Sequence, residues 1–143
     1  MKSTLVLLWI CLLFSKPPVA ITESTAQRFS AGTPDGGSGT KYSIQMIASY
    51  GSDEMSVEAF WVDSTCLDFN IFTLTNNKSF VKGDTLIIKA NSYFHQPKGS
   101  QKKINPGPAP DYNGRALIIF NVKQRLKSVE IEQFTKLSAL YFP

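Results

Sequence analysis

The sequence predicts an all-β fold, an antiparallel β-sandwich, and two observations lead to this prediction. From residue 41 onward, short segments alternate apolar and polar residues with a period of two, which is typical of half-buried strands. Turn residues such as Gly, Asn and Asp separate these segments at short intervals. About six to eight short strands joined by turns indicate a sandwich or barrel-like domain.

The alternation is clearest in "YSIQMIASY", where Tyr42, Ile44 and Met46 share one face of the expected strand. Near Phe72 the alternation in "CLDFNIFTL" changes parity, which indicates a bulge or a strand that changes sides. The expected strands, in chain order, are 42–50, 55–62, 66–74, 85–94, 115–122 and 127–133.

The C-terminal segment permits two structures. Phe134, Leu137 and Tyr141 lie at helical spacing, whereas residues 127–133 alternate as a strand does. We therefore expect a strand over 127–133 and leave strand and helix open for 136–142. An α+β domain with one C-terminal helix is the alternative fold.

Two segments, "TLII" at 85–88 and "ALIIF" at 116–120, are apolar on both faces. A sandwich strand with one solvated face normally alternates, so these strands are either covered on both sides or leave one face for a partner. We expect cover from the chain itself, by a C-terminal helix or the N-terminal segment, because a large exposed apolar patch favours aggregation.

The N-terminal residues predict export. Lys2 precedes an apolar run of about ten residues, Leu5 to Phe14, which is too short to span a bilayer as a helix and suits a signal peptide. We expect cleavage after Ala20, with cleavage after Ala26 as the second choice and an uncleaved membrane anchor as the alternative. The predicted location is secreted or periplasmic, and no membrane span is expected in the mature chain.

Removal of residues 1–20 leaves 123 residues, enough for one domain with a hydrophobic core. Residues 21–40, rich in Ser, Thr and Gly, are expected to form a flexible leader, and 41–143 a single β-sandwich domain. Cys11 leaves with the signal, so Cys66 has no intramolecular partner and no disulfide is expected. We expect Cys66 to be a buried, unreactive thiol, with an intermolecular disulfide as the alternative.

Charge is unevenly distributed along the chain. Residues 21–77 hold two basic and seven acidic residues, a net charge of −5, and residues 78–143 hold eleven basic and four acidic residues, a net charge of +7. If the two halves interleave as neighbouring strands, these charges cancel. If they do not, two poles of opposite sign attract an acidic ligand or stack molecules head to tail.

Several chemistries are excluded by the composition. His95 and Cys66 are the only His and Cys after residue 20, which is too few for a zinc site built from Cys and His or for a blue-copper site, so no metal or cofactor is expected. No recognisable hydrolase or nucleotide-binding motif is present. Asp63 and Asp68 leave a small hydrolase with paired carboxylates as a remote alternative. We therefore expect a protein that is not an enzyme.

The candidate binding segment is "FHQPKGSQKKINPGPAPDYNGR", residues 94–115. A loop of about twenty residues inside a compact domain is unusual and is often functional. Its lysines carry positive charge with no acid before Asp111, and neighbouring aromatic residues offer flat contact area. The predicted ligand-binding residues are Lys98, Lys102, Lys103, Tyr93, Tyr112 and Arg115.

These observations predict an exported, non-enzymatic binding module for an anionic glycan or an acidic protein surface. The alternative is a structural or assembly subunit that pairs through an exposed sheet face, an edge strand or the C-terminal apolar segment, so a homo-oligomer is possible. A solvated spacer is the simplest alternative for the loop. Nucleic acid is not an expected partner, because interleaved aromatic and arginine residues are absent. Asn77 begins an N-glycosylation sequon on an expected turn.

Overall fold

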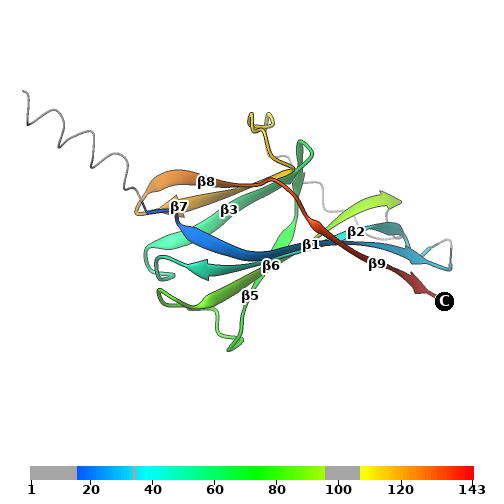
Figure 1. Cartoon of the computed structure of the whole chain (residues 1–143), viewed down its shortest axis with the longest axis horizontal. Coiled ribbons are helices and arrows are strands. Elements are labelled where there is room, and N and C mark those ends of the chain that lie inside the picture. Colours follow the sequence, from blue (N-terminus) through cyan, green and yellow to red (C-terminus); the bar gives the residue numbers. More distant parts are fainter. Residues whose placement is uncertain (1–15, 34, 96–106) are drawn as a thin grey trace, which may run out of the picture.

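The computed structural model describes residues 16–33, 35–95 and 107–143, and these residues contain strands and no helix. Two sheets pack face to face, which confirms the predicted all-β sandwich (Figure 1). The strands are β1 (Val19–Ala31), β2 (Ser38–Ala48), β3 (Met55–Val62), β4 (Thr65–Leu67), β5 (Phe69–Thr73), β6 (Thr85–His95), β7 (Ala116–Val122), β8 (Arg125–Ile131) and β9 (Thr135–Phe142).

The first sheet, sheet A, has the order β5-β6-β2-β1-β9, and the second, sheet B, has the order β4-β3-β7-β8. Neighbouring strands are antiparallel, with the exception of β9, which runs parallel to β1. β9 is an edge strand of sheet A, and the chain reaches it directly from β8, an edge strand of sheet B.

The hydrophobic core lies between the two sheets, where the period-two pattern places the apolar residues. Ile44 of β2 pairs with Ile88 of β6, and Phe60 of β3 pairs with Ile118 of β7. All four side chains are at most 1% exposed. Burial of such side chains stabilises each by about 1.5–3 kcal/mol relative to exposure, so this double layer holds the sandwich together.

Both hairpins of sheet B close with two-residue turns of positive φ. Asp63 and Ser64 join β3 to β4, and Lys123 and Gln124 join β7 to β8, with φ between 47° and 67°. Two consecutive residues in this region form the type I′ turn whose twist matches that of antiparallel strands. The turn at Asp63 therefore lies at the end of sheet B where β3 returns as β4.

The expectation of a flexible leader over 21–40 is wrong, because these residues form most of β1 and the start of β2. The register of β1 against β2 shifts between Ile21 and Glu23. This bulge reverses which residues face the core, so the apolar residues of β1 do not alternate along the sequence. The signal-peptide prediction falls mostly on residues 1–15, outside the described residues.

Two further sequence expectations are resolved by the topology. Residues 136–142, left open between strand and helix, form most of β9. The change of parity in 66–74 reflects a change of sheet, since β4 belongs to sheet B and β5 to sheet A; the crossing occurs at Asp68, earlier than the shift near Phe72.

The two oppositely charged halves of the sequence interleave. Strands β1, β2 and β3 of the acidic half pair with β9, β6 and β7 of the basic half. Ion pairs of Asp63 with Arg115 and of Glu54 with Lys123 join the halves. This arrangement brings opposite charges together rather than separating them into two poles.

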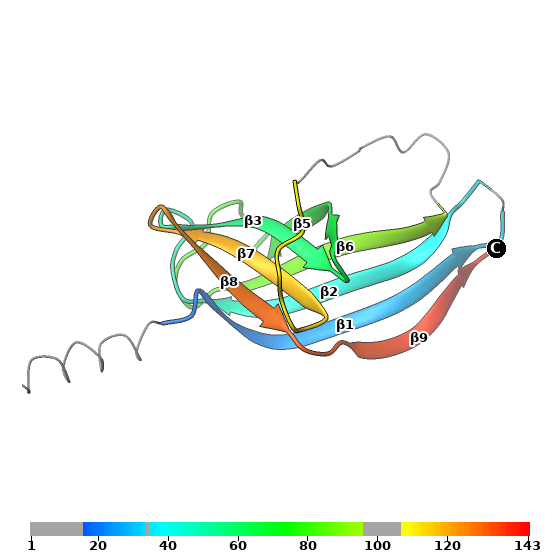
Figure 2. The same cartoon turned by 90° about the horizontal axis from the view of Figure 1, so that it is seen from above.

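Part of the outer face of sheet B is covered by the chain itself. Trp61 of β3 pairs with Leu117 of β7 outside the core cluster, yet each is only 4% exposed. The segment 107–115 lies on this side of sheet B (Figures 1 and 2). The expectation of internal cover is thus confirmed here, although neither a helix nor the N-terminal segment provides it.

Sheet A is longer than sheet B, so one end of it projects beyond the sandwich (Figure 2). We call this end the wing; it comprises residues 26–31, 38–42, 91–95 and 136–142. Within it, Gly39 stands so close to β6 that a Cβ atom would collide with the carbonyl oxygen of Ser92. Glycine therefore permits the register shift between β2 and β6 at this point.

Candidate functional site

A hollow that we call the wing groove lies where the wing leaves the end of sheet B. It has a volume of about 940 Å³. Its floor is the inner face of the wing, and its walls are the β3–β4 turn, the start of β7 and the β8–β9 connection. It is lined by Ala26, Arg28, Thr40, Tyr42, Val62, Asp63, Ser92, Phe94, Arg115, Glu132, Gln133, Phe134, Lys136, Leu137 and Ala139.

Strand alternation explains why polar and charged side chains line this floor. The face of β2 that carries Ile44 in the core continues outward as Tyr42 and Thr40, and the same face of β6 ends in Ser92 and Phe94. The sequence therefore changes from apolar to polar on one face at the point where sheet B ends.

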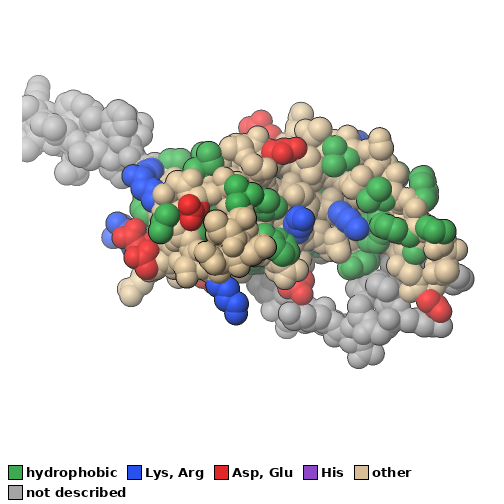
Figure 3. All heavy atoms as spheres, turned by 90° about the horizontal axis from the view of Figure 1, so that it is seen from below, with side chains coloured by type: hydrophobic (Ala, Val, Ile, Leu, Met, Phe, Trp, Pro, Cys, Tyr) green, Lys and Arg blue, Asp and Glu red, His purple; other side chains and the backbone are tan. Residues whose placement is uncertain are grey.

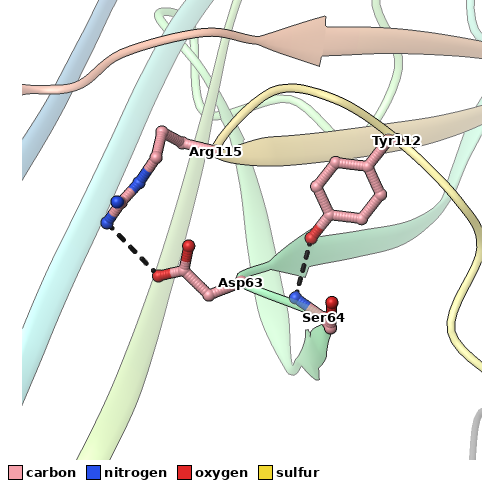
Figure 4. Close-up of polar contacts among 4 residues, drawn as sticks. All are labelled: Asp63, Ser64, Tyr112 and Arg115. Atoms are coloured by element: carbon pink, nitrogen blue, oxygen red, sulfur yellow. Dashed lines mark hydrogen bonds and ion pairs between the residues drawn. The ribbon is translucent and has the colours of Figure 1, made fainter.

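The wall of the groove is held by polar contacts between the β3–β4 turn and the segment before β7 (Figure 4). The Arg115 guanidinium lies 3.4 Å from an Asp63 carboxylate oxygen. The Ser64 backbone N–H donates to the Tyr112 hydroxyl at 2.9 Å, and the Asp63 N–H donates to the Arg115 carbonyl at 3.1 Å. These contacts fix the turn against sheet B.

Aromatic rings occupy the base of the groove. Tyr42 contacts Phe134 with ring centroids 5.0 Å apart and Phe60 of the core at 6.3 Å. Burial, and after it the negative charge of Asp63, raises the pKa of the Tyr42 phenol, while Arg115 acts in the opposite direction. Tyr42 thus marks the boundary between the core and the groove.

The predicted ligand-binding residues are only partly brought together. Arg115 lines the groove, but Tyr112 is half-buried and its hydroxyl serves the turn at Ser64. Tyr93 lies on the opposite face of β6 from the groove residue Phe94. The lysines of the prediction, Lys98, Lys102 and Lys103, lie outside the described residues.

Sequence reasoning missed the charged groove residues Arg28 and Lys136. Arg28 belongs to β1, whose alternation is interrupted by the bulge and was therefore not recognised in the sequence. The Arg28 guanidinium lies 5.9 Å from the centre of the Phe94 ring. Lys136 belongs to the segment whose structure was left open. The pairing of Lys136 with Ala26 in the β1–β9 ladder was the missing information, because it sets which face Lys136 occupies.

The outer face of the wing carries an aromatic cluster. The Phe29 and Tyr93 rings meet edge to face at 5.7 Å. The Lys41 ammonium lies 5.4 Å from the Phe29 ring centre and 5.1 Å from that of Phe142. Figure 3, which shows this side of sheet A, places apolar side chains over the wing with lysine and arginine nearby.

The second candidate surface is the edge of sheet A formed by β9. All eight residues of β9 are exposed, and among the described residues only β1 pairs with it. The last six residues, 137–142, carry no charge. Their large apolar side chains are exposed by 47% (Leu137), 37% (Leu140), 79% (Tyr141) and 44% (Phe142).

The other edge strands differ from β9. β4 has three residues and β5 has five, which limits pairing with another chain. β8 is longer but carries Arg125, Lys127 and Glu130 along its seven residues. Short length and charged side chains are the usual protection of sheet edges, and β9 has neither beyond Lys136.

The remaining site hypotheses receive no support from geometry. Asp63 lines the groove and is paired with Arg115, whereas Asp68 is not among the groove residues. No group of three or more His, Cys, Asp and Glu residues suited to a metal ion occurs in the described part of the chain. Cys66 is half-buried rather than fully buried, and burial raises the pKa of its thiol. Asn77 is exposed in the β5–β6 connection.

Within residues 16–33, 35–95 and 107–143, no helix is long and apolar enough to span a bilayer. Comparison of the chain with protein-family models, with curated proteins and with solved structures found no match.

Proposed function

We propose that this protein is an exported, non-enzymatic interaction module whose β9 edge receives an extended strand from another chain. The observation that carries the proposal is the uncharged, exposed edge over residues 137–142. Addition of a strand satisfies the free backbone groups of an edge and covers its apolar side chains, which is the mechanism of β-augmentation.

The wing geometry supports this proposal in two ways. Sheet B does not cover the wing, so a new strand beside β9 meets no obstacle from the second layer (Figure 2). The anchor of β9 is also secure: its partner β1 lies inside the sheet, and the Gln27 side-chain amide donates to the Ser138 carbonyl at 2.7 Å. A firmly held edge lowers the entropic cost of adding a strand.

The test uses hydrogen exchange with a synthetic probe peptide of alternating Thr and Val, flanked by lysines for solubility. We expect the probe to slow exchange of β9 amides and to leave β8 amides unchanged. The Leu140→Lys variant, which places a charge on the edge, is expected to lose this protection, whereas the matched Leu126→Lys variant on β8 keeps it. Equal protection of β8 and β9, or none, would contradict the proposal.

A second function, binding of an anionic glycan or acidic protein surface, is supported by the cations of the wing groove. Arg28, Arg115 and Lys136 line the groove with Asp63 and Glu132, and Asp63 is already paired with Arg115. The predicted lysines Lys98, Lys102 and Lys103 belong to the segment that leads toward Arg115.

Binding to a panel of neutral and anionic polysaccharides at two salt concentrations tests this second function. We expect salt-sensitive binding of the anionic members only, weakened both in a Lys98, Lys102 and Lys103 to Ser variant and in Arg28→Gln. Lys82→Gln, on an exposed turn outside the groove, is the control. Binding that survives both changes would place the ligand elsewhere.

A further inference from the structure

We propose that the strand received by β9 is β9 of a second copy of this chain, antiparallel to the first and related to it by a two-fold axis perpendicular to sheet A. The inference rests on the proposed function and names its partner. Such pairing would join the two copies of sheet A into one continuous sheet of ten strands.

The first argument is that β9 is complementary to itself across such an axis. In the register with β1, Leu137 lies beside Gln27 and Leu140 beside Phe29, so the ladder assigns both leucines to the outer face of the sheet, with Leu137 also bordering the wing groove at the sheet edge. A two-fold axis perpendicular to the sheet keeps the outer face of one copy next to the outer face of the other. Outer residues of β9 therefore meet outer residues.

The irregularity of β9 fixes the register. The β1–β9 ladder shifts between Gln27 and Phe29, so one extra residue lies between Leu137 and Leu140. When Leu137 of one copy faces Leu140 of the other, the irregular Ser138 and Ala139 face each other, and every opposed pair shares a face. A shift by one residue would oppose inner residues to outer ones.

Charge also favours this register. On the inner face it places Lys136 of each copy opposite Tyr141 of the other, so a cation meets an aromatic ring and no two like charges are opposed. The two Lys136 residues lie at opposite ends of the ladder, separated by five residue steps, which is about 17 Å in a strand. Their repulsion is screened at that distance.

The shape of the molecule allows the pairing. β9 begins beside the end of sheet B and runs away from the sandwich to the wing tip (Figure 2). Antiparallel β9 strands therefore place the two sandwiches at opposite ends of the joined ladder, where they do not collide. The outer apolar side chains Leu140 and Phe142 of both copies then form one continuous patch across the axis, beside Phe29, which is 8% exposed.

The decisive experiment is cysteine exchange across the axis in the full chain, with Cys11 and Cys66 replaced by Ser. Opposed residues of antiparallel strands have Cα atoms about 4.5–5.5 Å apart, within the range that a disulfide spans. We expect a mixture of Leu137→Cys and Leu140→Cys chains to give a disulfide-linked dimer on mild oxidation, and neither variant alone to do so. Leu126→Cys mixed with Val129→Cys, at the same spacing on β8, is the negative control.

Sedimentation of the full chain without added cysteines gives an independent measurement. We expect a monomer–dimer equilibrium whose dissociation constant rises at least about tenfold in Leu140→Lys and stays unchanged in Leu126→Lys. Residues 1–15 are present in every variant, so association through them is common to all. A dissociation constant that is unchanged in Leu140→Lys would overturn the pairing.

The two proposals fail in different ways. If the chain stays monomeric and the mixture gives no disulfide, but the probe peptide still protects β9 amides, the second copy is the wrong partner and the proposed function stands. If β9 amides gain no protection from the peptide either, both proposals fall. Cross-linking by Leu137→Cys alone would overturn the register.

Discussion

The two ends of sheet A are built from the same strands but differ in what covers them. At the sandwich end, Ile44 and Met46 of β2 are fully buried beneath sheet B. At the wing end, the same face of β2 carries Tyr42 and Thr40, which line a groove. The strands continue without a break, so hydrogen bonding in the ladder is common to both ends while hydrophobic burial is not.

This difference shows how one sheet combines a stable domain with an exposed surface. The free energy of folding comes mainly from apolar area removed from water, and that area is concentrated at the sandwich end. The wing is stabilised by its ladder and by aromatic contacts such as Phe29 with Tyr93. Its low share of burial leaves side chains and one strand edge available for a partner.

The largest expected effect compares two residues on one face of β6. Ile88 is 1% exposed in the core, and Phe94 is 65% exposed at the wing. Ile88→Ala is expected to reduce the free energy of unfolding by about 2–5 kcal/mol, whereas Phe94→Ala is expected to change it by less than about 1 kcal/mol. Urea unfolding at low protein concentration, with the slope of the transition compared between variants, measures both.

Equal losses in the two variants would show that the wing contributes to stability as the core does. The comparison requires low concentration, because association through β9 would add stability to the wing. Repeating the urea unfolding at high protein concentration then shows whether Phe94→Ala reduces the free energy of unfolding by more when two copies pair.

The second effect compares truncation at the start of β1, in the sandwich, with truncation at the end of β9, in the wing. A chain that begins at Ile21 lacks Val19, which is 3% exposed, and lacks the Pro18 carbonyl that accepts from the Ser49 N–H at 3.0 Å. Relative to a chain that begins at Lys16, we expect a loss of about 1.5–3 kcal/mol in the free energy of unfolding. Removal of Phe142 and Pro143 from the wing is expected to cost less than about 1 kcal/mol.

This truncation also bears on processing. Cleavage after Ala26 would cut β1 within the segments that pair with β2 and with β9. Cleavage after Ala20 would remove Val19 from the core. If the chain is exported and processed, as the sequence predicts, we therefore expect the mature N-terminus, determined by mass spectrometry, to precede Val19. A mature chain that begins at Ile21 and unfolds at the same urea concentration as the longer form would contradict this expectation.

The fold class was predictable because most strands show their alternation in the sequence. Ile44 and Met46, or Phe60 and Val62, occupy every second position and all face the core. β1 was missed because its bulge after Ile21 changes the parity within the strand. Thr25 illustrates the difficulty: it lies beside Ser43 on the outer face of sheet A, yet it is buried at 9% exposure, and nothing in its sequence neighbourhood predicts this burial.

The candidate site was less predictable than the fold because it depends on long-range pairing. The sequence identified Arg115 and also raised the C-terminal segment as a possible pairing element. It did not reveal that β9 pairs with β1, more than one hundred residues away, as in Thr25 with Thr135. Only this pairing makes β9 an edge strand and brings Lys136 and Arg28 into one groove.

The smallest effect concerns Tyr42, at the boundary between the two ends of sheet A. Burial and the Asp63 carboxylate raise the pKa of its phenol, and Arg115 lowers it. Asp63→Asn removes a negative charge that opposes the phenolate, so we expect the pKa of Tyr42 to fall toward its ordinary value. Arg115→Gln removes a positive charge that favours the phenolate, so we expect the pKa to rise further.

Ultraviolet titration of tyrosine ionisation, with the Tyr42→Phe chain subtracted, isolates this group. Because the pKa is higher in the folded than in the unfolded chain, the unfolded chain loses the proton first as pH rises. Stability associated with Tyr42 is therefore complete below the ordinary tyrosine pKa and declines above it. Shifts of the same sign in Asp63→Asn and Arg115→Gln would mean that the two charges act through a rearranged groove wall, and the wing would then be less independent of the sandwich than its burial indicates.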